Sequence, residues 1–282
     1  MPLPHFLIIG AMKAGTTTLY RDLLTHPRIF FPMDKEPGTL TDDAVLTDEG
    51  RAAYADLFKD AGADQLCAEA STAYTKRPTH EGVAARAVEL LGPELRVIYI
   101  MRDPIERLRS QHRHEVTTGE IAEHDLGDAI AAHPRLIEYS RYAYQLEPWL
   151  EVLGPRRVLP IGLEAYSADR AAGAAAAQAF LGLEPRADLV DAERVFNRGD
   201  AKPVVRGAWQ LVQQSAVYQR AIRPLIGVET RRKLREAFLP KATTELAEPS
   251  QASFAEIRER LAPDLARLRE QLGERAPVWS SD

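Results

Sequence analysis

FLIIGAMKAGTTTLY, residues 6–20, runs from four consecutive apolar residues into a loop with two glycines, a lysine and three threonines. Apolar residues at helical spacing follow over residues 16–25. Glycines let the backbone approach a ligand, and the N-terminus of a helix carries a partial positive charge. A buried strand that leads through such a loop into a helix is therefore a common anion-binding arrangement. The segment predicts a strand, a phosphate-binding loop and a helix.

Short apolar runs alternate with helical patterns further along the chain. Strands are predicted over residues 65–70, 96–101 and 156–164, and a helix closed by glycine over 83–92. Pro160 places the last strand at the edge or end of a sheet. Strands separated by helices predict an α/β fold, with a central parallel sheet covered on both faces. The C-terminal third is predicted to be helical over 204–222, 229–238 and 254–272.

Composition limits the class of protein. The chain has 282 residues, 45 % of them apolar, which is enough for a core, and no linker divides residues 1–282, so we expect a single domain. A net charge of −5 favours neither nucleic acid nor an anionic membrane as partner. No apolar run approaches the ~18 residues of a membrane span. The single Cys67 fits a reducing compartment, so we expect a cytoplasmic protein, and the Ala- and Arg-rich composition suggests a bacterial one.

The glycine loop, Gly10–Gly15, differs from the loop that binds nucleoside triphosphates. It keeps the spacing of the two glycines, but Lys13 precedes the second glycine instead of following it. The Lys-Ser/Thr pair that holds terminal phosphates and magnesium is therefore missing, and we expect phosphate binding without a metal. The residues predicted to bind this phosphate are Lys13, Ala14, Gly15, Thr16, Thr17 and Thr18.

A second strand–helix junction repeats this design over residues 96–114. Arg102 follows the strand, Asp103-Pro104 opens a helix, and Ser110 lies two turns into that helix. A guanidinium and a hydroxyl in these positions are suited to binding a second phosphate. Because the carboxyl ends of parallel strands meet at one edge of a sheet, the two junctions predict one site for a ligand with separated phosphates.

Two segments of the sequence resemble those of a known family. GAMKAGTTTL and RDPIERLRSQHRH resemble the sulfotransferases that use 3′-phosphoadenosine-5′-phosphosulfate (PAPS), in the branch shared by carbohydrate sulfotransferases and bacterial relatives. The resemblance implies a three-layer, P-loop-like fold. Further segments similar to the family's motifs follow in the family's order over residues 34–40, 68–74, 138–166, 180–185, 196–203 and 258–279.

The resemblance also implies roles for individual residues. The glycine loop would bind the 5′-phosphosulfate, and Arg102 and Ser110 the 3′-phosphate. Arg198 and Lys202 belong to a segment, residues 196–203, that would cover the nucleotide. No metal is implied.

Sulfuryl transfer requires a base for the acceptor proton and positive charge at the leaving phosphate. Lys13 is suited to the second task. By resemblance Glu36 is the expected base, with His112, expected on a partly exposed helix face, as the alternative. If the segment around Glu36 is extended, Lys35 points away from that carboxylate. Glu69 is interpreted as a supporting group at a strand end.

Three departures from the family affect the acceptor more than the donor. Gly38-Thr39-Leu40 replaces an aromatic pair, Ala70 a lysine, and His112 a tyrosine. The acceptor is therefore left open as a hydroxyl or amine of a small molecule, carbohydrate or lipid, and the sequence does not determine the oligomeric state. A P-loop small-molecule kinase, or a nucleotide-binding protein without transfer activity, is the alternative.

Overall fold

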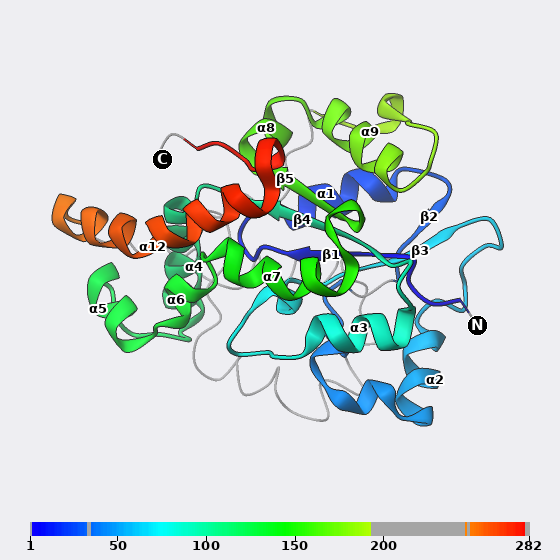
Figure 1. Ribbon diagram of the computed structural model, residues 1–282, viewed down its shortest axis with the longest axis horizontal. Coiled ribbons are helices and arrows are strands. Elements are labelled where there is room, and N and C mark those ends of the chain that lie inside the picture. Colours follow the sequence, from blue (N-terminus) through cyan, green and yellow to red (C-terminus); the bar gives the residue numbers. More distant parts are fainter. Residues whose placement is uncertain (1, 33–34, 193–245, 247–248, 280–282) are drawn as a thin grey trace, which may run out of the picture.

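A parallel sheet forms the centre of the computed structural model, which describes residues 2–32, 35–192, 246 and 249–279 (Figure 1). In the described part, five strands are ordered β2-β3-β1-β4-β5, and every pairing is parallel. The strands are β1 (Phe6–Gly10), β2 (Ile29–Phe30), β3 (Leu66–Ala70), β4 (Arg96–Met101) and β5 (Val158–Gly162). The four predicted strands are confirmed, and Pro160 lies in the edge strand β5, as predicted. The two-residue β2 has no periodic pattern and was not predicted.

Helices cover both faces of this sheet. Their bounds are α1 (Thr16–Leu24), α2 (Asp48–Asp56), α3 (Val83–Leu91), α4 (Pro104–Thr118), α5 (Leu126–Ala132), α6 (Arg135–Glu138), α7 (Tyr142–Leu153), α8 (Leu163–Ala168), α9 (Arg170–Phe180) and α12 (Gln251–Leu272). The predicted helices that begin at residues 16, 83 and 254 correspond to α1, α3 and α12. Those predicted over 204–222 and 229–238 lie outside the described residues.

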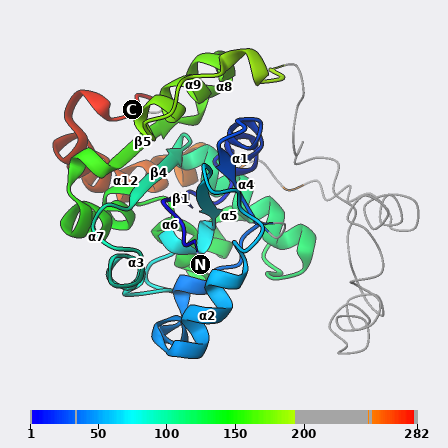
Figure 2. The same cartoon turned by 90° about the vertical axis from the view of Figure 1, so that its right-hand side faces the viewer.

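Alternate residues of the strands supply two separate cores. In β1, Leu7 and Ile9 face the core formed with α3, α7 and α12, whereas Phe6 and Ile8 face the core formed with α1 and α9. Figure 2 shows α1, α8 and α9 on one side of the strands and α3 on the other. The arrangement confirms the predicted three-layer α/β fold. It explains why the strands are continuous apolar runs, because both faces of each strand are buried.

Helix α12 is bound to α7. The carboxylate of Asp264 in α12 accepts hydrogen bonds from the amides of Ala143 and Tyr144, at 2.9 and 3.0 Å. It therefore satisfies N–H groups in the first turn of α7, which have no acceptor within that helix. No helix in the described ranges is both long and apolar enough to span a membrane.

Candidate functional site

The glycine loop connects β1 to α1 at the carboxyl edge of the sheet. Gly15 precedes the helix with φ +84°, and Lys13 has φ +67°, so the backbone turns back on itself before α1. Gly15 has no side chain to cap the first turn of α1. The Thr18 amide donates to the Gly15 carbonyl at 2.9 Å, which leaves the N–H groups of Thr16 and Thr17 open to an anion. Thr16, which is buried, and the half-buried Thr17 and Thr18 begin the helix at this point.

Packing as well as backbone geometry requires the two glycines of this loop. A Cβ atom on Gly10 would lie 2.1 Å from Oγ1 of Thr75, and one on Gly15 would lie 2.4 Å from Cδ1 of Leu163. The first contact shows how closely the short helix η3 (Thr72–Thr75) approaches the loop. The Thr75 hydroxyl also donates a hydrogen bond to the Ile9 carbonyl at 2.6 Å, which fixes η3 against the end of β1.

The second predicted junction lies directly beside the glycine loop. The amide of Ala11 donates to the carbonyl of Ile100 in β4 at 2.6 Å, so the two loops share one edge of the sheet, as predicted. Tyr142 holds the backbone of Arg102, because its hydroxyl donates to the Arg102 carbonyl at 2.7 Å. The Arg102 guanidinium donates to Glu106 at 3.2 Å and remains 29 % exposed.

The N-terminus of α4 differs from that of α1. The Asp103 carboxylate accepts the amides of Ile105 and Glu106, both at 3.0 Å, and so caps α4. An anion at this junction must therefore be bound by side chains rather than by the helix N-terminus. Ser110 lies one turn beyond Glu106 on the same face of α4, and so on the side where Arg102 is held.

Glu36 lies in a turn, the 36–40 turn (Glu36–Leu40), that the end of β3 holds in place. Its φ is +64°, in the left-handed region that residues other than glycine rarely adopt. The Glu36 amide donates to the Ala70 carbonyl at 2.9 Å, and the Gly38 amide donates to Oγ of Ser71 at 3.0 Å. These contacts offset the backbone strain and place Glu36 beside η3, which in turn contacts the glycine loop.

The neighbours of the Glu36 carboxylate correct one expectation. An extended segment would turn Lys35 away, but the left-handed backbone brings its ammonium to 2.5 Å from Oε1. The Thr72 hydroxyl donates to Oε2 at 3.2 Å. Burial raises the pKa of Glu36, but Lys35, Thr72 and Lys76 together lower it by more, so the net pKa is below its usual value. The side chain is 45 % exposed, so this ionised carboxylate is open to an incoming molecule.

Lys76 is a site residue that sequence reasoning missed. It follows η3 directly, and its ammonium lies 6.0 Å from the centre of the Tyr139 ring. Burial lowers its pKa, an effect that Glu36 and Glu115 oppose. Lys76 therefore places a half-buried cation close to Glu36. A single lysine after a strand-end segment gives no sequence signal by itself, since only the fold brings it within electrostatic range of that carboxylate.

Glu69 occupies a different environment from Glu36. It is 0 % exposed at the end of β3, and the hydroxyls of Tyr54 and Tyr74 both donate to its carboxylate. Burial raises the pKa of Glu69 to about 7, although the hydrogen bonds from the two tyrosines favour the ionised form. Its position fits the predicted role as a supporting group, because an acceptor cannot reach it.

His112 is more deeply placed than expected. The predicted partly exposed position is wrong: the side chain is 3 % exposed, and its Nε2 donates to the carbonyl of Glu123 at 2.8 Å. A ring held in this way has its Nε2 proton committed to the backbone carbonyl. Arg198 and Lys202 lie outside the described residues.

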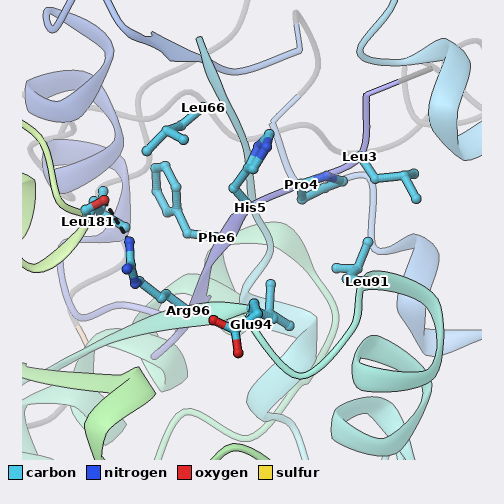
Figure 3. A pocket seen from close by; sticks show the side chains of 10 residues that line it. Leu3, Pro4, His5, Phe6, Leu66, Leu91, Glu94, Arg96 and Leu181 are labelled. Atoms are coloured by element: carbon cyan, nitrogen blue, oxygen red, sulfur yellow. Dashed lines mark hydrogen bonds between the residues drawn. The ribbon is translucent and has the colours of Figure 1, made fainter. Parts of the chain in front are cut away.

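The cavity shown in Figure 3 lies at the other edge of the sheet. Its volume is about 400 Å³, and it is lined by the amino ends of β1, β3 and β4. Ligands of parallel α/β folds bind at the carboxyl ends of the strands, so this cavity is not the candidate site. Its lining residues are Leu3, Pro4, His5, Phe6, Leu66, Leu91, Glu94, Leu95, Arg96 and Leu181. Within the described ranges, no cluster of three or more His, Cys, Asp or Glu residues is placed to hold a metal ion.

Comparison with known proteins identifies the family of the chain. The model of the sulfotransferase family matches residues 4–188, which include the glycine loop, the 36–40 turn and the Arg102 junction. The chain belongs to the sulfotransferase family. Among sulfotransferases it is similar to the bifunctional heparan sulfate N-deacetylase/N-sulfotransferase 4 of Mus musculus, with 28 % identity over 212 residues, covering 67 % of this chain and 23 % of that protein.

Two further sulfotransferases extend the comparison. The heparan sulfate glucosamine 3-O-sulfotransferase 3B1 of Mus musculus is 26 % identical over 248 residues, which cover 84 % of this chain and 61 % of that protein. The chain thus spans less than two thirds of either mouse relative. The solved sulfotransferase from Alicyclobacillus acidocaldarius has 22 % identity and a TM-score of 0.66 over 96 % of both chains, which shows a shared fold.

Proposed function

We propose that the protein transfers a sulfuryl group from PAPS to a hydroxyl or amine of a small-molecule, carbohydrate or lipid acceptor. One observation carries the proposal. The glycine loop with the start of α1, which no side chain caps, the Arg102 junction and the accessible carboxylate of Glu36 lie together at one edge of the sheet. Membership of the sulfotransferase family supports the reaction class.

In this proposal the two junctions bind the two ends of the donor. The first turn of α1 and Lys13 bind the 5′-phosphosulfate, and Arg102 and Ser110 bind the 3′-phosphate. The 3′-phosphate takes over Arg102 from Glu106, since a phosphate offers a doubly charged acceptor to the same guanidinium. Arg198 and Lys202 are proposed to cover the bound nucleotide.

The chemical step is an in-line displacement at sulfur. The acceptor oxygen or nitrogen forms a bond to sulfur while the bond from sulfur to the 5′-phosphate oxygen breaks, and the electron pair leaves with that oxygen. Glu36 takes the acceptor proton. Its lowered pKa keeps the carboxylate ionised and therefore able to accept that proton. Lys13 and the N–H groups of α1 stabilise the charge that develops on the leaving phosphate.

We infer a cytoplasmic location and a bacterial origin from composition. Cys67 is free and buried in the core, which suits a reducing compartment.

The Arg102 assignment predicts a selective loss of affinity. Arg102→Ala should weaken binding of 3′-phosphoadenosine-5′-phosphate by roughly 2–3 kcal/mol, because one charge-assisted interaction with the 3′-phosphate is lost. Binding of AMP, which lacks that phosphate, should not change. Isothermal titration calorimetry of both ligands on both proteins provides the measurement and its control. Equal losses for AMP would place Arg102 elsewhere on the nucleotide.

Metal removal separates this function from a kinase. Because Lys13 and the α1 N-terminus supply the positive charge, sulfuryl transfer measured with radiolabelled PAPS should be unchanged after treatment with EDTA. A kinase built on a P-loop would lose all turnover and recover it with magnesium. Magnesium-dependent turnover of ATP by the purified protein would therefore revive the kinase alternative.

A further inference from the structure

The carboxylate of Glu69 is buried without a cation. Among the described residues no Lys or Arg forms an ion pair with it, and the hydroxyls of Tyr54 in α2 and Tyr74 in η3 donate hydrogen bonds to it. The Ser71 hydroxyl and the Gly38 amide also face it and lower its pKa. Burying a charge without a partner of opposite sign costs free energy, and a neutral side chain would avoid that cost. The contacts of Glu69 therefore need an explanation beyond the stability of the core.

Those contacts lead to the 36–40 turn. The Tyr74 hydroxyl has one hydrogen to donate, and it donates it to Glu69, which leaves its oxygen to accept the amide of Leu40 at 3.2 Å. On the other side of the turn, the next residue of β3, Ala70, accepts the amide of Glu36 at 2.9 Å. Glu69 thus orients Tyr74, which holds the end of the 36–40 turn. Its neighbour in β3, Ala70, holds the beginning of the same turn.

We propose that ionised Glu69 is a positioning residue: through Tyr74 it holds the 36–40 turn so that the strained Glu36 presents its carboxylate beside the glycine loop. We call this hold of Glu69 and Tyr74 on the 36–40 turn the clamp. The role in catalysis rests on the proposed function, whereas the clamp does not. A negative acceptor is needed here because the hydroxyls of Tyr54 and Tyr74 both donate to it, one to each carboxylate oxygen. A protonated Glu69 carries a hydrogen on one oxygen, so the tyrosine that faces that oxygen loses its acceptor. When the proton is on Oε1, Tyr74 is released from its orientation.

The clamp predicts a dependence on pH near neutrality. Burial raises the pKa of Glu69 to about 7. The other titratable groups around it stay neutral, because burial and Glu69 raise the pKa values of Tyr54 and Tyr74 well above 10, and burial raises that of Cys67 on the same face of β3. As the pH falls through 7, Glu69 takes up a proton, the turn loosens, and the chemical step slows.

Hydrogen exchange measures the clamp without any substrate. In the wild type, protection of the amides in residues 36–41, corrected for the intrinsic pH dependence of exchange, should fall between pH 8 and pH 6. Glu69→Gln mimics the protonated form, so its turn should be poorly protected over that whole range, while peptides from β1 and β4 keep their protection. Tyr54→Phe is the matched variant, because it removes a hydrogen-bond donor to Glu69 on the side away from the turn. Protection of residues 36–41 should be kept at high pH. The pH midpoint at which this protection is lost should move upward, since a hydrogen bond that favours ionised Glu69 is missing.

Turnover then links the clamp to catalysis. With PAPS and 2-naphthol as probes, kcat of Glu69→Gln should fall by about 10- to 100-fold, a range typical of a displaced catalytic group, and should lose the wild-type change near pH 7. The KM for PAPS should not change. If the wild type transfers nothing to any acceptor, the proposed function fails, but the exchange result still decides the clamp.

Two results with Glu69→Gln would overturn the proposal. One is wild-type protection of residues 36–41 in Glu69→Gln at every pH. The other is a folded variant whose protection is lowered well beyond residues 36–41, as for a residue needed only for the stability of the core. If Glu69→Gln does not fold, the wild type and Tyr54→Phe decide the matter: no midpoint between pH 6 and 8 in either would refute the clamp.

Discussion

Glu36→Gln is expected to lower kcat by a factor of ~10²–10⁴ without changing the affinity for 3′-phosphoadenosine-5′-phosphate. Glutamine keeps the size of the side chain but cannot take the acceptor proton. The backbone contact that holds the turn, from the Glu36 amide to the Ala70 carbonyl, does not involve the side chain and is retained. Single-turnover transfer from radiolabelled PAPS measures the chemical step, and calorimetry measures the nucleotide affinity.

The pH dependence gives an independent check on Glu36. Its pKa is lowered, so the carboxylate stays ionised, and able to act as a base, to a pH below the ordinary ~4.3 of a glutamate. In the wild type this limit is hidden by the change near pH 7 that we assign to Glu69. In Glu69→Gln, which lacks that change, the residual activity should persist down to mildly acidic pH.

His112→Ala is the comparison for Glu36→Gln. The ring is 3 % exposed and donates to the Glu123 carbonyl, so its loss should affect the packing of α4 more than the chemical step. We expect it to lower kcat by less than Glu36→Gln does. Turnover within a few-fold of wild type in Glu36→Gln, together with complete loss in His112→Ala, would mean that the base has been assigned to the wrong residue.

The fold was predictable because its strands are buried on both faces. An apolar run such as Arg96–Met101 carries its own signal, and the glycine loop and Pro160 mark a turn and an edge by backbone chemistry alone. The strand β2 has only two residues, and its pairing with β3 depends on a partner distant in sequence. Short pairings of this kind leave no local pattern.

The candidate site was predictable in its residue types but not in their surroundings. Lys35 was expected to point away from Glu36 if the segment is extended, whereas Ala70 and Ser71, more than thirty positions away, hold the left-handed turn that brings Lys35 onto the carboxylate. The same long-range packing buries His112 and brings Lys76 within electrostatic range of Glu36, whose pKa it lowers. Sequence order identifies which groups reach the edge of the sheet, but the charge that each experiences is set by neighbours brought from other elements.

Lys13→Met is expected to lower kcat by a factor of ~10²–10³, the loss usual when a preorganised group at a developing negative charge is removed. Methionine has a similar length and no charge. It also places the same demand on the left-handed backbone at this position, φ +67°, so the loop need not change shape. Positive charge counts most when the bond to sulfur is breaking, so kcat should fall by a larger factor than the affinity for 3′-phosphoadenosine-5′-phosphate.

Two further variants sharpen this test of Lys13. Lys13→Arg keeps the charge and should recover part of the rate, although a planar guanidinium fits a point-charge site poorly. Lys59→Met removes an exposed lysine that pairs with Asp56 at 3.1 Å, and should leave the rate unchanged. Single-turnover rates with PAPS compare the three proteins directly. A rate for Lys13→Met within a few-fold of wild type would contradict the role assigned to Lys13. The α1 N-terminus alone would then be enough to stabilise the leaving phosphate.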